Sequence, residues 1–247
     1  MTTWIRQFHP APQARMRLLC LPHAGGSASA YFALSRTLAP EVEVLSVQYP
    51  GRQDRRSEPL LGSIGELRDG IAGALEPWRD RPLALFGHSM GAVLAYELAR
   101  LLSRDGGTPP AHLFVSGRGN PAQRVEMPLD ELDDRAMIAA LDDLGGTSIG
   151  LLDDEEVLRM VAPAIRSDYR AVRTYRHTPG PLLPCPVTAL VGDADAMAAV
   201  EEVEKWRDHT SADFRLKVFQ GGHFYLSNQF QKVGELVYDR LSYSLST

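Results

Sequence analysis

The segment Gly87-His88-Ser89-Met90-Gly91 constrains the fold of this chain more than any other feature of its sequence. An apolar run at 82–86 precedes it, and apolar residues at helical spacing follow it at 92–102. This order is typical of a nucleophile elbow, a sharp turn between a strand and a helix that exposes a serine hydroxyl. The two glycines lack the Cβ atoms that would clash at such a turn. Because G-x-S-x-G also occurs in ordinary loops, these five residues by themselves leave a purely structural turn equally open.

Short apolar runs alternate with helical segments along most of the chain. Six runs are expected to be strands, at 17–21, 42–49, 83–86, 112–116, 187–191 and 214–219. A helix is expected over 63–78, because Ser63 and Glu66 form a capping box ahead of apolar residues at helical spacing. The alternation favours an α/β fold with a mostly parallel central sheet and helices on both faces. One such domain of 247 residues can bury a sizeable core.

The rhythm changes between residues 126 and 175. Two amphipathic helical stretches, at about 129–144 and 153–175, follow each other there with no strand between them, and a glycine-rich turn is expected at 145–150. We interpret 126–175 as a helical lid inserted into a core that comprises 1–125 and 176–247. The alternative is that these helices simply cover the sheet.

A serine hydroxyl is a poor nucleophile near neutral pH, so acyl transfer by Ser89 needs a histidine base and an acid that orients it. In chains of this topology the acid follows the nucleophile, and the histidine follows the acid. The chain has seven histidines, of which His223 is the best candidate. It comes directly after the last expected strand, where Gly221-Gly222 lets the backbone bend and present the imidazole at the edge of the sheet.

The acid is expected after the strand that precedes the histidine, where Gly192-Asp193-Ala194-Asp195 offers two carboxylates. A turn at Gly192 brings Asp195 toward His223, so Asp195 is the preferred acid. Asp193 is expected to hydrogen-bond the backbone of the turn, as aspartate commonly does. The loop 115–121, where some proteins of this topology carry the acid, contains neither Asp nor Glu.

The oxyanion of the tetrahedral intermediate needs backbone N–H donors. Met90, which follows the nucleophile, is expected to supply one, and the glycine-rich loop 21–28 the other. Alternatively, Gly25-Gly26 could form a phosphate-binding turn, although the loop lacks both the G-x-G-x-x-G and the Walker spacing.

Composition argues against several other functions. The net charge is −5, and no basic cluster is longer than Arg55-Arg56, so a nucleic-acid partner is not expected. The N-terminal residues lack an apolar signal region, and no stretch approaches the length of a membrane span, which makes a cytoplasmic protein the default. Cys20 and Cys185 have no metal-ligand spacing and are expected to be buried core residues in a reducing compartment. We expect no metal and no cofactor.

Five motifs occur in order along the chain: Pro-His-Ala-Gly-Gly at 22–26, Gln-Tyr-Pro-Gly-Arg at 48–52, the elbow at 87–91, Gly-Asp-Ala-Asp at 192–195 and Gly-Gly-His-Phe at 221–224. With them the chain resembles the type II thioesterases, which are stand-alone α/β-hydrolase thioesterases of polyketide and nonribosomal peptide assembly lines. The resemblance extends from about residue 17 to about residue 239. Two places depart from the usual pattern, the loop 117–121 and Ala196 after the acid, and neither removes a catalytic group.

The resemblance implies that the protein hydrolyses acyl groups from the phosphopantetheine arm of acyl or peptidyl carrier proteins, chiefly to clear stalled or aberrant units. It implies that Ser89 is the nucleophile, His223 the general base and Asp195 its orienting acid. Ala24 and Met90 are then the oxyanion donors, and carrier proteins are the expected partners of a monomeric enzyme.

Some questions stay open at this level. The turn at 48–52 is either purely structural or functional; if functional, Arg52 could pair with an acid that anchors the loop, or meet the phosphate of the arm. A carboxylester hydrolase or an acyltransferase of the same fold would share the acyl-enzyme intermediate. A non-catalytic protein that binds carrier proteins is disfavoured by the presence of Ser89, Asp195 and His223.

Overall fold

The computed structural model describes residues 4–104, 106–124, 128–144 and 154–244. The turn expected at 145–150 and the expected start of the lid at residue 126 lie outside these residues.

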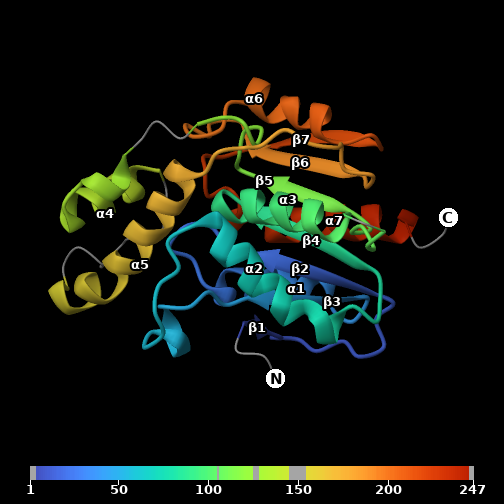
Figure 1. Ribbon diagram of the computed structural model, residues 1–247, viewed down its shortest axis with the longest axis horizontal. Coiled ribbons are helices and arrows are strands. Elements are labelled where there is room, and N and C mark those ends of the chain that lie inside the picture. The colour runs from blue at the N-terminus through green and yellow to red at the C-terminus, as the bar shows by residue number, and fades with distance from the viewer. Residues whose placement is uncertain (1–3, 105, 125–127, 145–153, 245–247) are drawn as a thin grey trace.

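A seven-stranded sheet forms the centre of the protein, with the strand order β1-β3-β2-β4-β5-β6-β7 (Figure 1). The strands are β1 (Ile5–Arg6), β2 (Met16–Leu21), β3 (Val42–Val47), β4 (Leu83–His88), β5 (Leu113–Ser116), β6 (Val187–Gly192) and β7 (Phe214–Phe219). Neighbouring strands from β3 to β7 run parallel, and only β1 pairs antiparallel, with β3. The six expected strands are confirmed to within two residues at each end. The strand β1 was not expected, because two residues are too short to show alternation.

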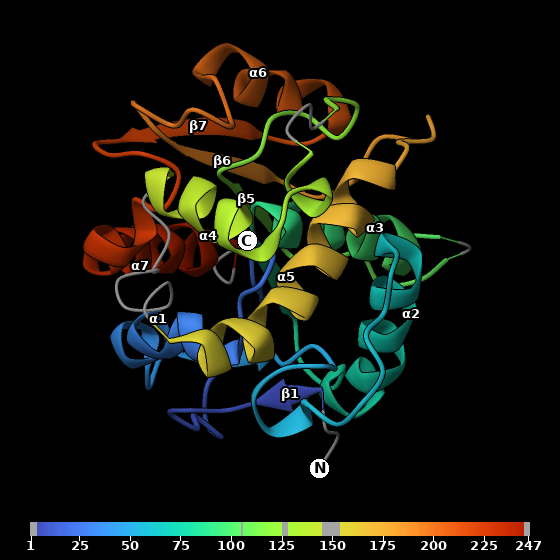
Figure 2. The ribbon, with the colours of Figure 1, turned by 90° about the vertical axis from the view of Figure 1, so that its left-hand side faces the viewer.

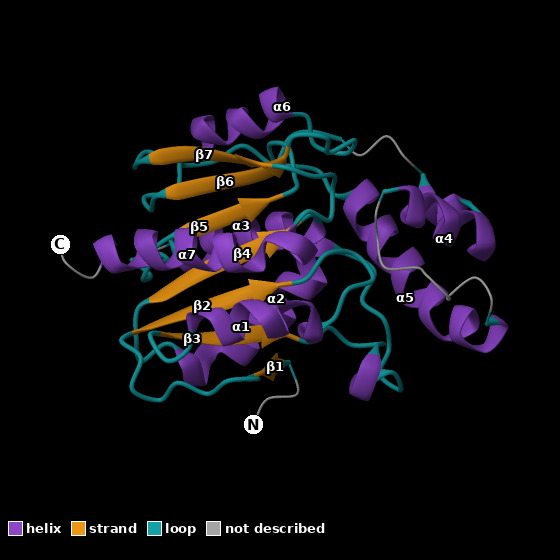
Figure 3. Ribbon diagram, turned by 180° about the vertical axis from the view of Figure 1, so that it is seen from behind, coloured by secondary structure: helices purple, strands orange, loops and turns teal. Residues whose placement is uncertain are grey.

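Helices cover both faces of the sheet, as expected for an α/β fold (Figure 3). One face carries α1 (Phe32–Leu38) and α7 (Leu226–Ser244), and the other carries α2 (Ile64–Leu75), α3 (Met90–Leu102) and α6 (Val200–Glu204). The strands separate the two layers by alternation: Leu18 of β2 packs with the first layer and Leu19 with the second, and both are fully buried. Short 3-10 helices occupy Ala28–Tyr31, Gln53–Arg55, Glu76–Trp78, Leu129–Glu131 and Lys205–His209.

The capping box expected at the start of α2 is present. The Ser63 hydroxyl accepts a hydrogen bond from the Glu66 N–H at 3.2 Å and donates to the Glu66 carboxylate at 2.8 Å. The carboxylate also accepts from the Gly62 N–H at 3.2 Å. The Glu66 N–H, one of the orphan donors at the start of the helix, is satisfied in this way, and the Gly62 N–H just before the N-cap gains an acceptor as well.

Two further helices, α4 (Asp134–Asp143) and α5 (Glu155–Thr174), project beyond the ends toward which the parallel strands point (Figures 1 and 3). In the view along the sheet they cross in front of it (Figure 2). The carboxylate of Asp130, in the 3-10 turn before α4, accepts two hydrogen bonds from Arg173 of α5, both at 2.8 Å. The division of the chain into a core and a lid stays a prediction. These helices lie beyond the carboxyl ends of the parallel strands, the edge of the sheet that carries Ser89 (Figure 1).

Candidate active site

Ser89 occupies a strained turn between β4 and α3. Its backbone has φ 55° and ψ −114°, a conformation that costs energy for a residue with a side chain. A Cβ on Gly87 would lie 2.0 Å from the Gly91 carbonyl oxygen, and one on Gly91 would lie 1.9 Å from the Leu21 carbonyl oxygen. Both flanking positions therefore admit only glycine at this backbone geometry. The strand, sharp turn and helix expected around Ser89 are all present.

His223 lies in the turn between β7 and α7, and its Nδ1 is 3.0 Å from both carboxylate oxygens of Asp195. The two side chains are 1% and 0% exposed, so the pair is shielded from water. The Asp195 carboxylate also accepts hydrogen bonds from the N–H groups of Met197, at 2.9 Å, and Ala198, at 3.2 Å. His223 Nε2 is buried and has no hydrogen-bond partner among the described residues, so it is free to accept a proton.

Asp193 has a different task. Its carboxylate accepts a hydrogen bond from the Gly221 N–H at 2.9 Å, and the Ala194 N–H donates to the Gly221 carbonyl at 3.0 Å. A Cβ on Gly192 would lie 2.3 Å from that same carbonyl oxygen, so the two loops approach as closely as backbones can. Asp193 therefore joins the acid loop to the histidine loop, and only Asp195 contacts the imidazole of His223.

Two histidines from the resemblance motifs surround His223. The ring centroids of His88 and His223 are 5.1 Å apart, those of His23 and His88 are 6.0 Å apart, and the Phe224 ring lies 5.0 Å from both His23 and His223. Desolvation and the neighbouring His223 lower the pKa of His23 to about 4 and the pKa of His88 well below its ordinary value. Both rings are therefore neutral near pH 7. Both lie inside the motifs that carry the resemblance, and both precede Ser89 in the chain.

The other histidines have structural contacts at a distance from this cluster. His112, just before β5, is buried, and its Nε2 lies 2.8 Å from the Thr188 hydroxyl. His177 and His209 both approach the Tyr96 hydroxyl, at 3.2 and 3.3 Å, and His9 lies 3.2 Å from the Ser35 hydroxyl.

The two N–H groups expected to bind the oxyanion belong to Ala24, in the loop after β2, and Met90, the first residue of α3. Both residues are buried, and neither N–H has a hydrogen-bond acceptor in the described part of the chain. Unused donors of this kind suit an oxyanion hole, because the developing charge meets groups that already point at it. The assignment of these two donors stays a prediction.

The neighbouring glycines are used within the protein itself. The Gly26 N–H donates to the His23 carbonyl at 2.9 Å, and the Gly25 N–H donates to the carboxylate of Asp168 at 2.7 Å. These donors are therefore not available to a phosphate. Arg52 pairs with the same Asp168 carboxylate, with its Nη2 3.0 Å from one oxygen. Of the roles considered for Arg52, the structure shows the pairing with an acid.

A cavity of about 470 Å³ lies beside this loop. Its lining comes from the loop after β2, from the turn that follows β3 and from α5: Gly25, Ser27, Gly51, Arg52, Gln53, Asp54, Arg56, Met160, Val161 and Ala164. The cavity therefore lies between the core and α5 of the expected lid, and Ser89, Asp195 and His223 are not among the residues that line it.

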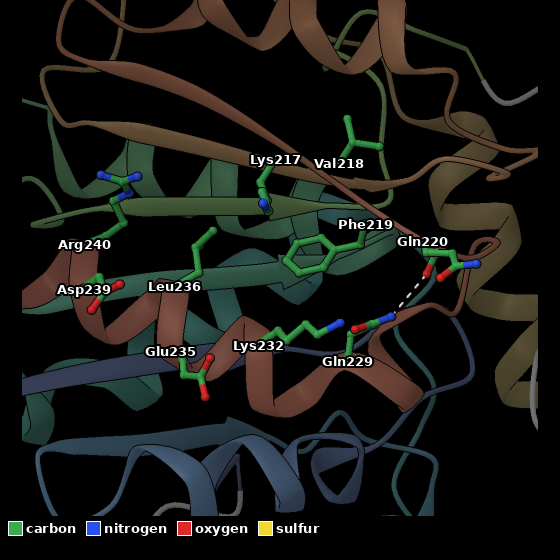
Figure 4. Close-up of a pocket in the computed structure, with 10 residues that line it drawn as sticks. All are labelled: Lys217, Val218, Phe219, Gln220, Gln229, Lys232, Glu235, Leu236, Asp239 and Arg240. Atoms are coloured by element: carbon green, nitrogen blue, oxygen red, sulfur yellow. Dashed lines mark hydrogen bonds between the residues drawn. The ribbon is translucent and has the colours of Figure 1, made fainter.

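Another cavity, of about 430 Å³, lies between β7 and α7 (Figure 4). Charged side chains such as Lys217 and Lys232 line it, and the Gln229 amide donates to the Gln220 carbonyl at its rim, at 3.4 Å. None of the expected site residues contributes to it.

Cys20 and Cys185 are both buried and unpaired, which confirms their expected place in the core. Burial raises the pKa of the Cys185 thiol to about 12, so it stays protonated near pH 7.

Within the described residues no three His, Cys, Asp or Glu side chains are grouped so that they could hold a metal ion. No helix in the described ranges is both long and apolar enough to span a membrane.

A parallel sheet with a serine elbow after β4, an aspartate after β6 and a histidine after β7 defines an α/β-hydrolase. The sequence profile of the thioesterase domain matches residues 16–241, and the chain belongs to this family of thioester hydrolases.

Individual relatives are similar over nearly the whole chain. The thioesterase PikA5 of Streptomyces venezuelae is 52% identical over 239 residues, which cover 96% of this chain and 85% of PikA5. The solved structure of the type II thioesterase BorB, from the borrelidin biosynthetic cluster, matches with a TM-score of 0.89 and 47% identity and covers 96% of this chain and 97% of BorB. RedJ, a thioesterase of the prodiginine pathway in Streptomyces coelicolor, matches with a TM-score of 0.84 and 37% identity, over 92% of this chain and 88% of RedJ. These similarities confirm the resemblance to type II thioesterases.

Proposed function

We propose that this thioesterase hydrolyses acyl groups from the phosphopantetheine arm of carrier proteins in polyketide or nonribosomal peptide biosynthesis. The observation that carries the proposal is the buried pair of His223 and Asp195, in which Nε2 of the histidine has no hydrogen-bond partner among the described residues. Support for the biosynthetic setting comes from the relatives, since BorB belongs to the borrelidin cluster and RedJ to the prodiginine pathway.

In the first step the Ser89 hydroxyl oxygen attacks the thioester carbon, and His223 Nε2 takes the hydroxyl proton. The charge that forms on the carbonyl oxygen is held by the N–H groups of Ala24 and Met90. The carbon–sulfur bond then breaks, and the protonated histidine gives its proton to the departing thiolate. The products are an acyl ester of Ser89 and the free thiol of the arm.

In the second step a water molecule attacks the acyl ester. His223 takes a proton from the water and returns it to the serine oxygen as the ester bond breaks, which releases a carboxylic acid and restores the enzyme. Asp195 holds the imidazole in one tautomer and stabilises its positive charge in both steps. A thiolate is a good leaving group, so this set of groups is sufficient for the chemistry.

The arm that carries the acyl group must reach Ser89 past α4 and α5. The 470 Å³ cavity beside Gly25 lies at this boundary, and Met160, Val161 and Ala164 give its α5 wall an apolar character. Such a wall suits an acyl chain better than a polar substrate.

A comparison of three substrates with the same acyl group tests the proposal: an acyl carrier protein, the acyl-pantetheine thioester and the ethyl ester. We expect kcat/KM to fall in that order. Ser89→Ala should abolish turnover and the acyl-enzyme adduct that mass spectrometry detects. Ser103→Ala is the matched control, because Ser103 lies at the opposite end of the same helix and its hydroxyl donates to the Ala99 carbonyl at 2.7 Å.

Other results would assign another function. Equal turnover of the ester and the carrier-bound substrate would make the protein a carboxylester hydrolase, and transfer of the acyl group to an added alcohol or amine would make it an acyltransferase. Tight binding of an acyl carrier protein without hydrolysis would make it a non-catalytic binding protein. The proposal further includes a monomer in the cytoplasm, which light scattering and cell fractionation test directly.

A further inference from the structure

Asp168 is a buried carboxylate on the apolar side of α5. Its side chain is 0% exposed, and the neighbours one helical turn away, Ile165 and Val172, belong to the core. An ionised carboxylate in such a place is costly unless every oxygen is paired. The Asp168 carboxylate therefore needs hydrogen-bond donors or a cation beside both of its oxygens.

The partners of Asp168 all come from the region around the expected oxyanion hole. One carboxylate oxygen accepts the Gly25 N–H at 2.7 Å and a hydrogen bond from Arg52 Nη1, and the other accepts from Arg52 Nη2 at 3.0 Å. Arg52 in turn donates to the carbonyls of Pro50, at 3.2 Å, and Gly26, at 3.4 Å. A side chain of α5 thus holds the loop after β2 both directly and through Arg52.

These contacts fix the backbone on both sides of Ala24. The Tyr49 hydroxyl donates to the Pro22 carbonyl at 3.0 Å, which holds the peptide group between residues 22 and 23. Asp168 holds the N–H of the peptide group between Ala24 and Gly25. The Ala24 N–H belongs to the peptide group between these two and has no acceptor of its own among the described residues.

α5 also touches the loop by packing. Gly25 has φ 75°, and a Cβ there would lie 2.6 Å from Cγ1 of Ile165. Ile165 and Asp168 are three residues apart and therefore lie on one side of the helix. The loop thus rests on α5 through one apolar and one charged contact.

We propose that Asp168 is a positioning residue for hydrolysis: through the Gly25 N–H it directs the Ala24 N–H at the oxyanion, so that the activity depends on α5 being seated against the core. This inference rests on the proposed function, since it takes Ser89 as the nucleophile. It extends that function by giving the expected lid a role in assembling the catalytic site in addition to covering it.

The test separates the hydrogen bond to Gly25 from the ion pair. Both double variants, Asp168→Asn with Arg52→Gln and Asp168→Ala with Arg52→Met, remove the buried charges together, which a protein tolerates better than the loss of one partner. Only the first retains an acceptor for the Gly25 N–H. Asp130→Asn is the control, because Asp130 is another buried carboxylate that pairs with an arginine of α5 but makes no hydrogen bond to this loop.

For each variant, kcat and KM are measured with an acyl-pantetheine thioester, and binding is measured for an alkylboronic acid and for the product carboxylic acid. The boronic acid forms a tetrahedral adduct with Ser89 and so needs the oxyanion hole, whereas the product acid does not. We expect the Ala/Met variant to lose about 10- to 100-fold in kcat and a similar factor in boronic acid affinity, below the loss for complete removal of an oxyanion donor. KM and affinity for the product acid should change little. The Asn/Gln variant should recover most of this loss.

Equal boronic acid affinity in the two double variants would overturn the inference, as would a loss of the same size in Asp130→Asn. Circular dichroism and a thermal melt show whether each variant is folded. If the Ala/Met variant is not folded, the Asn/Gln variant is compared with the parent enzyme, and a large loss of boronic acid affinity in this folded variant would overturn the inference. Failure of the proposed function would look different, because Ser89→Ala would then retain activity or the parent enzyme would not bind the boronic acid.

Discussion

Nδ1 of His223 is 3.0 Å from each of the two carboxylate oxygens of Asp195. An ionised carboxylate can only accept hydrogen bonds, so this contact assigns the proton of a neutral imidazole to Nδ1. The lone pair of Nε2 is then free to accept a proton, as the proposed mechanism requires. Burial of both side chains keeps water from competing for either nitrogen.

Asp195→Asn should lower kcat by about a thousandfold or more, because an amide can donate to the imidazole and favour the wrong tautomer. Asp193→Asn should lower kcat by less than about tenfold, since the amide oxygen can still accept from the Gly221 N–H. Steady-state kinetics with a single acyl thioester measures both effects. The reverse ranking would transfer the role of the acid to Asp193.

Gly91→Ala should reduce kcat by about a hundredfold, because the added Cβ would lie 1.9 Å from the Leu21 carbonyl oxygen and must push the elbow away from the loop after β2. Gly73→Ala is the matched control. A Cβ on Gly73 meets nothing within 4 Å, so this variant should keep its activity and gain about 0.5–1 kcal/mol of stability in α2. Kinetics and urea unfolding of the two variants check the contrast, and equal activity would mean that the elbow tolerates a displaced backbone.

Ser63→Ala should lower the free energy of unfolding by about 1 kcal/mol, because the Glu66 N–H loses its acceptor at the start of α2. Glu66→Gln should have a smaller effect, since a glutamine side chain can still accept from the Ser63 hydroxyl and the Gly62 N–H. Urea unfolding monitored by circular dichroism measures the difference. An unchanged midpoint for Ser63→Ala would show that the cap contributes nothing to the stability of the folded protein.

The stability of the protein should decrease as the pH falls from about 6.5 to about 4. Burial, and then the charge of Arg240, lower the pKa of His112 to about 4 in the folded state, below its ordinary value of 6.5. Between these values the unfolded chain binds the proton and the folded chain does not. The contribution of His112 to the free energy of unfolding is therefore fully present above pH 6.5, where the histidine is neutral in both states. This free energy falls by about 2–3 kcal/mol by the time the pH reaches 4.

His112→Gln tests this pH dependence without touching the candidate site, because His112 contacts Thr188 and stacks on Phe114 within the sheet. Glutamine does not titrate, so the variant should show a shallower decrease of stability between pH 6.5 and 4. Urea unfolding at several pH values provides the comparison. An identical pH dependence in the parent and the variant would exclude His112 as a source.

Local patterns were sufficient for most of the fold. The central strand β4 could be placed to within two residues because burial on both faces requires a continuous apolar run, and all six of its residues are buried. The edge strand β7 was readable from the alternation of apolar and charged residues at 214–217. The capping box of α2 was equally readable, since its two partners are three residues apart. The two-residue strand β1 was not, because its pairing with Val47 and Ser46 of β3 comes from the tertiary structure.

The same limit divides the candidate site. The sequence by itself singled out Ser89, Asp195 and His223 as candidates, because each lies in a short motif directly after a strand. It favoured Asp195 over Asp193 through the turn at Gly192, and only the tertiary structure decided that the Asp195 carboxylate lies 3.0 Å from the imidazole. It also decided that Arg52 pairs with Asp168.

A lone aspartate on the apolar face of an amphipathic helix was the one signal of Asp168 in the sequence, and such a signal does not name its partner. Asp168 and the Gly25 N–H are 143 residues apart, and the folding of α5 against the loop after β2 brings them together. Motifs therefore determined which groups can react, whereas long-range packing decided what holds those groups in place.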